Sequence, residues 1–157
     1  MCIHILLRFL LGRFERTAGE FYREYNANNQ FFATEPIKRM SKLTDNLLHG
    51  IDYEKVERKR RENYAYLHKR LGGMNQLNVK NAAFMYPLMV ENGAAIRKML
   101  QAKKIFIPTL WPTVFKVAKP TDVEYTMTEN ILPLPIDQRY GIEDMEYMVQ
   151  EVLKCIS

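Results

Sequence analysis

The chain has 157 residues, of which 47% are apolar, 11% aromatic and 26% charged. One domain of this size has enough apolar material for a hydrophobic core, and its aromatic content excludes a chain that is disordered throughout. The two cysteines, Cys2 and Cys155, lie near opposite ends, which excludes a disulfide scaffold and favours a reducing compartment.

The net charge of +5 is concentrated in one stretch of the chain. Residues 37–70 hold ten Lys and Arg against five Asp and Glu, and the remaining residues hold 13 against 13. A basic helix can bind nucleic acid or an anionic surface, but it is more often a solvated face. We therefore expect neither nucleic acid nor a membrane as a partner.

The longest apolar run, residues 3–11, is interrupted by Arg8. It is shorter than the roughly 20 residues that a membrane-spanning helix needs. It also lacks the charged start and the small-residue cleavage site of a signal peptide. These features predict a cytoplasmic protein.

Residues 1–35 are predicted to be an N-terminal remnant or extension. Pro36 marks a boundary, because proline disfavours helical backbone at the preceding residue. Residues 41–49 are typical of a short helix with a serine N-cap, and Gly50 suits a left-handed residue at its end.

A second helix is predicted over residues 52–71, with an aspartate N-cap and a double glycine after its end. Apolar residues near helical spacing predict one buried face, formed by Tyr53, Val56, Tyr64, Leu67 and Leu71. The short apolar run 82–90 predicts a strand, in which Pro87 favours an edge position or a bulge. Asn92 suits the cap of a helix over 93–102, which should point Ile96, Met99 and Leu100 inward.

Residues 104–108 predict a second strand, residues 109–121 a proline-interrupted loop, and residues 130–136 a third extended segment. The last predicted helix covers residues 142–156 and has a regular apolar stripe. The element order predicts an α+β fold with a small, mainly antiparallel sheet flanked by helices.

The common catalytic motifs are missing from this sequence. It contains no phosphate-binding GxxxxGK[ST] or GxGxxG loop, no GxSxG elbow and no HExxH pair. The three histidines, His4, His49 and His68, are scattered, so we expect structural roles for them, with His49 near carbonyls at a helix end. We predict no catalytic residue and no metal site.

Two C-terminal stretches and one upstream stretch nevertheless carry a resemblance. Residues 96–115 read IRKMLQAKKIFIPTLWPTVF, and residues 125–154 read YTMTENILPLPIDQRYGIEDMEYMVQEVLK. Both resemble the small C-terminal domain of the DegT/DnrJ/EryC1/StrS aminotransferases. Residues 40–67, MSKLTDNLLHGIDYEKVERKRRENYAYL, resemble the helical segment that joins the two domains of those enzymes. The resemblance covers about residues 36–156, so residues 36–157 are identified as an aminotransferase-like C-terminal domain that includes joining helices at 41–71.

The resemblance implies the fold of the aspartate-aminotransferase type and activity on nucleotide-linked keto-sugars. In the intact enzymes pyridoxal phosphate (PLP) is held by a large upstream domain, which supplies the catalytic lysine. Only about 40 residues precede the first predicted helix, and Lys38 lies outside any glycine-rich motif. We therefore expect a catalytically incomplete chain that binds no PLP alone, with a large catalytic domain on another chain, or a second copy, as partner. A small basic interaction module or a dimerisation module without catalysis is the alternative.

The resemblance also implies substrate-binding residues in a loop. Thr109 and Trp111 match the loop on the substrate side of the family's small domain. The indole of Trp111 could contact a sugar or nucleotide ring, or it could fill a gap between the loop and the sheet.

Three further candidates lie on the joining helix and near the last helix. Arg139 could bind the carboxylate of an amino donor such as glutamate through two hydrogen bonds, or it could pair with Asp137 or Glu143. Arg60 and Asn63 could face the substrate cleft from the joining helix, or they could be structural.

Overall fold

The computed structural model of the chain describes residues 27, 29–81 and 84–156. The chain divides into two units, Met1–Gly50 and Ile51–Ser157. The apolar run at 3–11 lies outside the described residues, and the predicted boundary at residues 35 and 36 stays a prediction. No helix of the described ranges is long and apolar enough to cross a membrane.

The first unit contains helix α3 (Lys42–His49), which agrees with the predicted helix. The hydroxyl of Ser41 caps it by accepting a hydrogen bond from the backbone N–H of Thr44 at 3.1 Å. At the other end, Nδ1 of His49 lies 2.8 Å from the carbonyl oxygen of Asp45, as expected for a histidine near helix-end carbonyls. Gly50 has a φ of −80°, so the prediction of a left-handed residue there is wrong.

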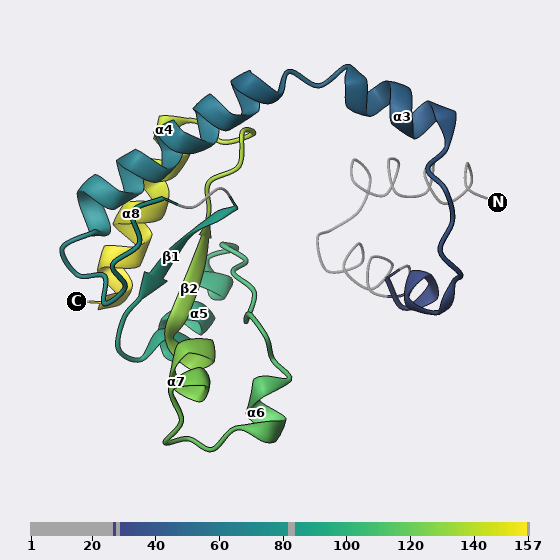
Figure 1. Cartoon of the computed structure of the whole chain (residues 1–157). Coiled ribbons are helices and arrows are strands. Elements are labelled where there is room, and N and C mark those ends of the chain that lie inside the picture. The colour runs from purple at the N-terminus through teal and green to yellow at the C-terminus, as the bar shows by residue number, and fades with distance from the viewer. Residues whose placement is uncertain (1–26, 28, 82–83, 157) are drawn as a thin grey trace. The chain divides into compact units, whose positions relative to one another are not determined.

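The second unit combines helices with a small antiparallel sheet, which confirms the α+β class (Figure 1). Its elements are α4 (Tyr53–Leu71), β1 (Met85–Met89), α5 (Gly93–Ala102), α6 (Val114–Val117), α7 (Val123–Asn130), β2 (Ile131–Pro135) and α8 (Ile142–Ile156). The predicted helices over 52–71, 93–102 and 142–156 are all present, and so are strands within 82–90 and 130–136. Residues 82 and 83 of the predicted strand lie outside the described residues.

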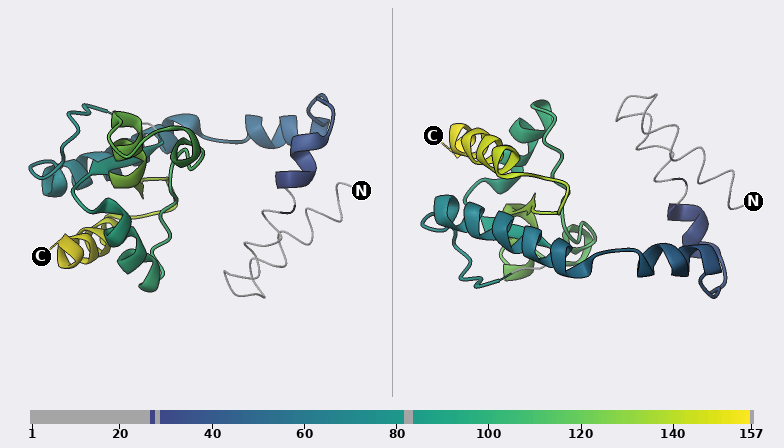
Figure 2. Two further views of the ribbon diagram at one scale, coloured as in Figure 1. Left: turned by 90° about the horizontal axis from the view of Figure 1, so that it is seen from below. Right: turned by 90° about the horizontal axis from the view of Figure 1, so that it is seen from above.

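Helices enclose the two strands. Helix α8 packs against both α4 and α5, while α4 contacts β1 and α5 contacts β2. Figure 2 shows α5 and α8 next to each other in both of its views. All these elements contribute large, fully buried side chains: Leu67, Leu71, Tyr86, Leu88, Leu100, Leu132, Leu134, Met145, Val149 and Val152.

The two strands of the sheet tolerate proline because each of them has one edge without a partner strand. Pro87 lies directly opposite Pro133 in the antiparallel register. Proline donates no hydrogen bond to a sheet ladder, so it belongs in edge strands, and each strand of a two-stranded sheet is an edge. The predicted edge position of Pro87 is confirmed.

The predicted strand over 104–108 is wrong. Lys104 adopts a φ of 63°, which turns the chain after α5, and residues 105–109 belong to no helix or strand. The predicted loop over 109–121 contains the short helix α6, and helix α7 follows where no helix is predicted.

Three side-chain predictions are also wrong. Tyr53 and Met99 were expected to point inward, but they are 59% and 43% exposed. The side chain of Asn92 makes no capping hydrogen bond, and its backbone is left-handed with a φ of 57°.

Candidate functional site

The buried amide of Asn63 connects α4 to the loop that joins β2 to α8. Its Nδ2 lies 3.3 Å from the carbonyl oxygen of Ile136 and 3.1 Å from those of Asp137 and Tyr140. The residue is fully buried, and its Oδ1 has no hydrogen-bond partner. Leaving a buried backbone carbonyl without a donor costs free energy. The three hydrogen bonds from Nδ2 to backbone carbonyls therefore fix the path of residues 136–140.

An ion pair within this loop holds Arg139. Its Nε and Nη2 each lie 2.8 Å from a different carboxylate oxygen of Asp137, which is the two-pronged geometry that guanidinium groups favour. The hydrogen bonds from Arg139 lower the pKa of Asp137, and the carboxylate in turn raises the pKa of Arg139. The guanidinium also lies 5.7 Å from the ring centroid of Tyr140. The pairing of Arg139 with Asp137 is thus present. Nη1 is the guanidinium nitrogen that takes no part in these two hydrogen bonds, so an incoming carboxylate would accept its hydrogen bond from Nη1.

Arg60 reaches the same loop from α4. Its Nε donates to Oε1 of Gln138 at 3.2 Å, and its charge contributes to lowering the pKa of Asp137. Three of the predicted site residues, Arg60, Asn63 and Arg139, therefore meet around residues 136–140. We call residues 136–140, together with the side chains of Arg60 and Asn63 that contact them, the arginine loop.

The other two predicted site residues lie in the segment between α5 and α6. The side chain of Trp111 is 58% exposed, so it is not buried as a hydrophobic plug. Its backbone φ is 50°, a strained value for a bulky side chain. No hydrogen bond of the described residues connects Thr109 or Trp111 to the arginine loop.

His68 has a structural environment, in agreement with its predicted role. Its ring stacks on Tyr64 with centroids 5.8 Å apart, and its Nδ1 lies 3.3 Å from the hydroxyl of Tyr86. His4 lies outside the described residues. Among those that are described, no group of three or more His, Cys, Asp or Glu could hold a metal ion.

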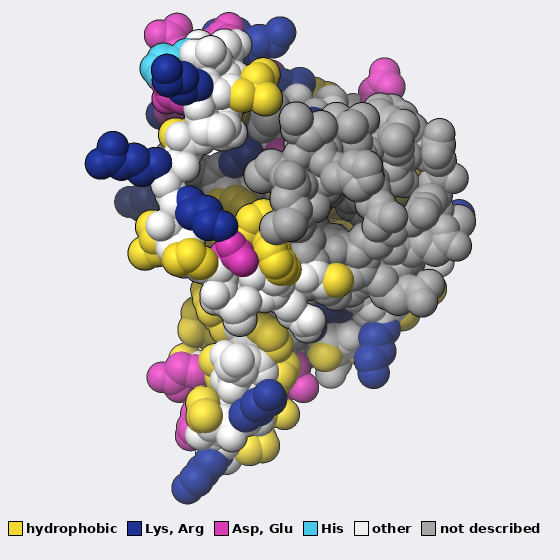
Figure 3. Space-filling model, turned by 90° about the vertical axis from the view of Figure 1, so that its right-hand side faces the viewer, with side chains coloured by type: hydrophobic (Ala, Val, Ile, Leu, Met, Phe, Trp, Pro, Cys, Tyr) yellow, Lys and Arg dark blue, Asp and Glu magenta, His cyan; other side chains and the backbone are white. Residues whose placement is uncertain are grey.

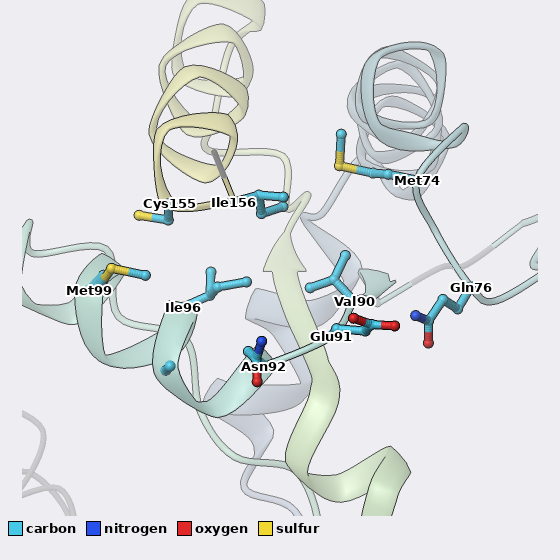
Figure 4. Close-up of a pocket in the computed structure, with 10 residues that line it drawn as sticks. Met74, Gln76, Val90, Glu91, Asn92, Ile96, Met99, Cys155 and Ile156 are labelled. Atoms are coloured by element: carbon cyan, nitrogen blue, oxygen red, sulfur yellow. The ribbon is translucent and has the colours of Figure 1, made fainter.

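A pocket that the sequence did not predict lies between α5 and the end of α8. Its volume is about 520 Å³, and apolar side chains form most of its lining: Met74, Val90, Ile96, Met99, Cys155 and Ile156. Figure 4 shows Cys155, Ile156 and Met74 across from Ile96 and Val90. These residues come from distant parts of the chain, so no local pattern could have found them.

Neither the pocket nor the arginine loop combines the groups that hold PLP in a protein. The cofactor needs a lysine for covalent attachment, an acidic partner for its ring nitrogen and donors for its phosphate. No lysine lines the pocket, where the only charged side chain is Glu91 and would repel a phosphate. The arginine loop has positive charge, but its described hydrogen bonds include no lysine.

Comparison of the chain with protein-family models, curated proteins and solved structures finds no match. The fold and the arginine loop therefore define an α+β protein with a cationic loop, and the resemblance to DegT/DnrJ/EryC1/StrS aminotransferases stays a prediction.

Proposed function

We propose that residues 36–157 act as the substrate-side domain of a PLP-dependent aminotransferase for nucleotide-linked keto-sugars, and that the chain alone is catalytically incomplete. The observation that supports this proposal is the convergence of Arg60, Asn63 and Arg139 on residues 136–140. A buried amide fixes the loop, and two guanidinium groups belong to it. Such groups bind carboxylates and phosphates, the anionic parts of an amino donor and of a sugar nucleotide.

In this proposal the large catalytic domain is supplied by another chain. This chain's own residues would bind and orient the substrate: Arg139 through Nη1, and Trp111 through its exposed indole face. An exposed aromatic ring can stack on a sugar or a base at low entropic cost, because it has few rotatable bonds.

The first experiment is a titration of the purified chain with PLP, followed by borohydride reduction and peptide mapping. We expect no single modified lysine, because neither the pocket nor the arginine loop combines the groups that the cofactor needs. One specifically modified lysine would overturn the catalytically incomplete part of the proposal.

A second experiment tests the substrate side directly. Titration with UDP-glucose, as a stand-in for a sugar nucleotide, should shift the indole signal of Trp111 in an NMR spectrum. The variant Arg139→Gln should weaken the binding about tenfold or more, since a charge-assisted hydrogen bond contributes about 1.5–3 kcal/mol. The matched control Lys119→Gln, at an exposed lysine, should leave it unchanged.

A dimerisation module is the second candidate, and the exposed apolar side of α3 favours it. Leu43 and Leu47 are spaced by one helical turn and are 61% and 63% exposed. Figure 3 shows hydrophobic side chains at the surface beside Lys and Arg. Light scattering over a range of concentrations tests this candidate, and a constant monomer mass would exclude it.

A nucleic-acid-binding module has less support. Three basic side chains of α4 are engaged in ion pairs: Lys59 with Glu62, Arg61 with Glu57, and Arg70 with Glu146. Binding to phosphates should fall steeply with salt, so an absence of nucleic-acid binding at low salt would exclude this function.

A further inference from the structure

The pocket between α5 and α8 has the composition of a small-molecule site. Its volume of about 520 Å³ lies within the roughly 300–1,000 Å³ range of ligand pockets. Val90 and Ile96 in its lining are buried, and the flexible thioethers of Met99 and Met74 lie on either side of them. Methionine adapts its shape to a ligand and makes favourable contacts with aromatic rings.

Hydrogen bonds fix the wall of the pocket that precedes β1. The carbonyl oxygen Oδ1 of Asn75 accepts from the backbone N–H of Leu77 and of Met89, each at 3.0 Å. Its Nδ2 donates to the carbonyl oxygen of Pro87 at 2.9 Å. This single side chain therefore ties the segment that carries Met74 and Gln76 to the strand β1.

The opposite wall, the start of α5, is held just as firmly. The backbone N–H of Gly93 donates to Oδ1 of Asn130 at 3.0 Å. A Cβ atom at position 93 would lie 2.5 Å from the carbonyl oxygen of Asn130, so only glycine permits this approach. Because both walls are fixed by such contacts, the pocket exists before a ligand binds, which lowers the entropic cost of binding.

The rim of the pocket is polar and carries a negative charge. Glu91 is the only charged residue in the lining, and the amides of Gln76 and Asn92 flank it (Figure 4). Glu91 makes no ion pair with any described residue. The cation Lys103, at the end of α5, is already paired with Glu151 at 2.5 Å. The charge at the rim is thus available to a positively charged group.

We propose that this pocket binds a small primary amine with an aromatic or branched apolar body. The body would occupy the space between Ile96, Met74 and Met99. The ammonium group would lie at the rim, where the Glu91 carboxylate and the amide oxygens accept its hydrogen bonds. This site is separate from the arginine loop and does not depend on the function proposed above.

Phenethylamine is a suitable probe, and methionine-methyl NMR of the full chain is a suitable measurement. We expect saturable shifts of the Met74 and Met99 signals, assigned with the variants Met74→Leu and Met99→Leu, with a Kd of about 1 mM. Phenethyl alcohol should bind more weakly, and hydrocinnamate, with a carboxylate in place of the amine, should not bind.

Two pairs of variants make the test specific. Glu91→Gln should weaken phenethylamine binding about fivefold, as expected for a partly exposed ion pair, whereas Glu124→Gln, at an exposed position outside the pocket, should not. Ala95→Phe should fill the pocket and abolish the shifts, whereas Lys98→Phe places the same side chain elsewhere on α5.

Some outcomes would overturn the proposal. The absence of saturable shifts up to about 10 mM phenethylamine in the folded chain would exclude the pocket as an amine site. Equal binding of the amine and the alcohol, unaffected by Glu91→Gln, would exclude the role of the charge.

Discussion

Helices α3 and α4 begin alike but are stabilised differently. Ser41 and Asp52 cap them, each by accepting a hydrogen bond from a backbone N–H of the first turn. Helix α3 has no buried residue, whereas α4 buries Tyr64, Leu67 and Leu71 against the core of its unit. A helix as short as α3 is marginal in water without packing. A cap therefore locates a helix, whereas burial supplies most of its stability.

The largest expected difference between the two helices comes from leucine truncation. Leu67→Ala should lower the free energy of unfolding of residues 51–157 by about 2–5 kcal/mol, because Leu67 is completely buried. Leu47→Ala should change it by less than about 0.5 kcal/mol, because Leu47 is exposed. Urea denaturation followed by circular dichroism measures both. Equal losses would mean that α3 is also packed in solution.

A second contrast concerns asparagine side chains. Asn63→Ala should cost about 2 kcal/mol of unfolding free energy, since it leaves buried carbonyls of the arginine loop without their donor. Asn46→Ala on α3 is the matched control, because that residue is exposed, and it should cost almost nothing. An undiminished stability of Asn63→Ala would show that water replaces the amide.

The helices were predictable because their signals are local. The N-caps Ser41 and Asp52 and the apolar stripe of α8 each lie within a few residues of the element they define. Helix α7 was missed because it has little amphipathic pattern and buries only Thr128. The strand predicted at 104–108 fails for a non-local reason: its apolar residue Ile107 is buried, but the segment has no strand partner.

The candidate sites show the same limit. The sequence indicated Asp137 as a partner for Arg139 because the two residues are close along the chain. The hydrogen bond from Asn63 to the carbonyl oxygen of Tyr140 joins residues that are 77 positions apart in the sequence. The role of Asn63 in fixing the loop could therefore not be derived from local spacing. The pocket joins residues as distant as Met74 and Cys155, so it depends on how α5, α8 and the segment after α4 pack together.

A third prediction compares the two caps. Asp52→Ala should lower the free energy of unfolding of residues 51–157 by about 1 kcal/mol, because α4 is part of the packed core. Ser41→Ala should remove a similar amount from α3 alone, without changing the unfolding midpoint of the second unit. Hydrogen exchange at the amides of each helix measures the local effect. A shift of the second unit's midpoint by Ser41→Ala would show that the units unfold together.

The smallest expected effect concerns the pH dependence of the arginine loop. Because Arg139 lowers the pKa of Asp137 in the folded state, the unfolded chain binds more protons at acidic pH. The ion pair therefore contributes its stability above the unfolded pKa of about 3.9, and this contribution is lost as the pH falls through the lower folded pKa. Asp137→Asn should thus cost up to about 1 kcal/mol near neutral pH, and the difference from the unmodified chain should shrink on acidification. Glu124→Gln is the control, and a difference that stays constant with pH would show that Asp137 stabilises the loop through its hydrogen bonds and not through its charge.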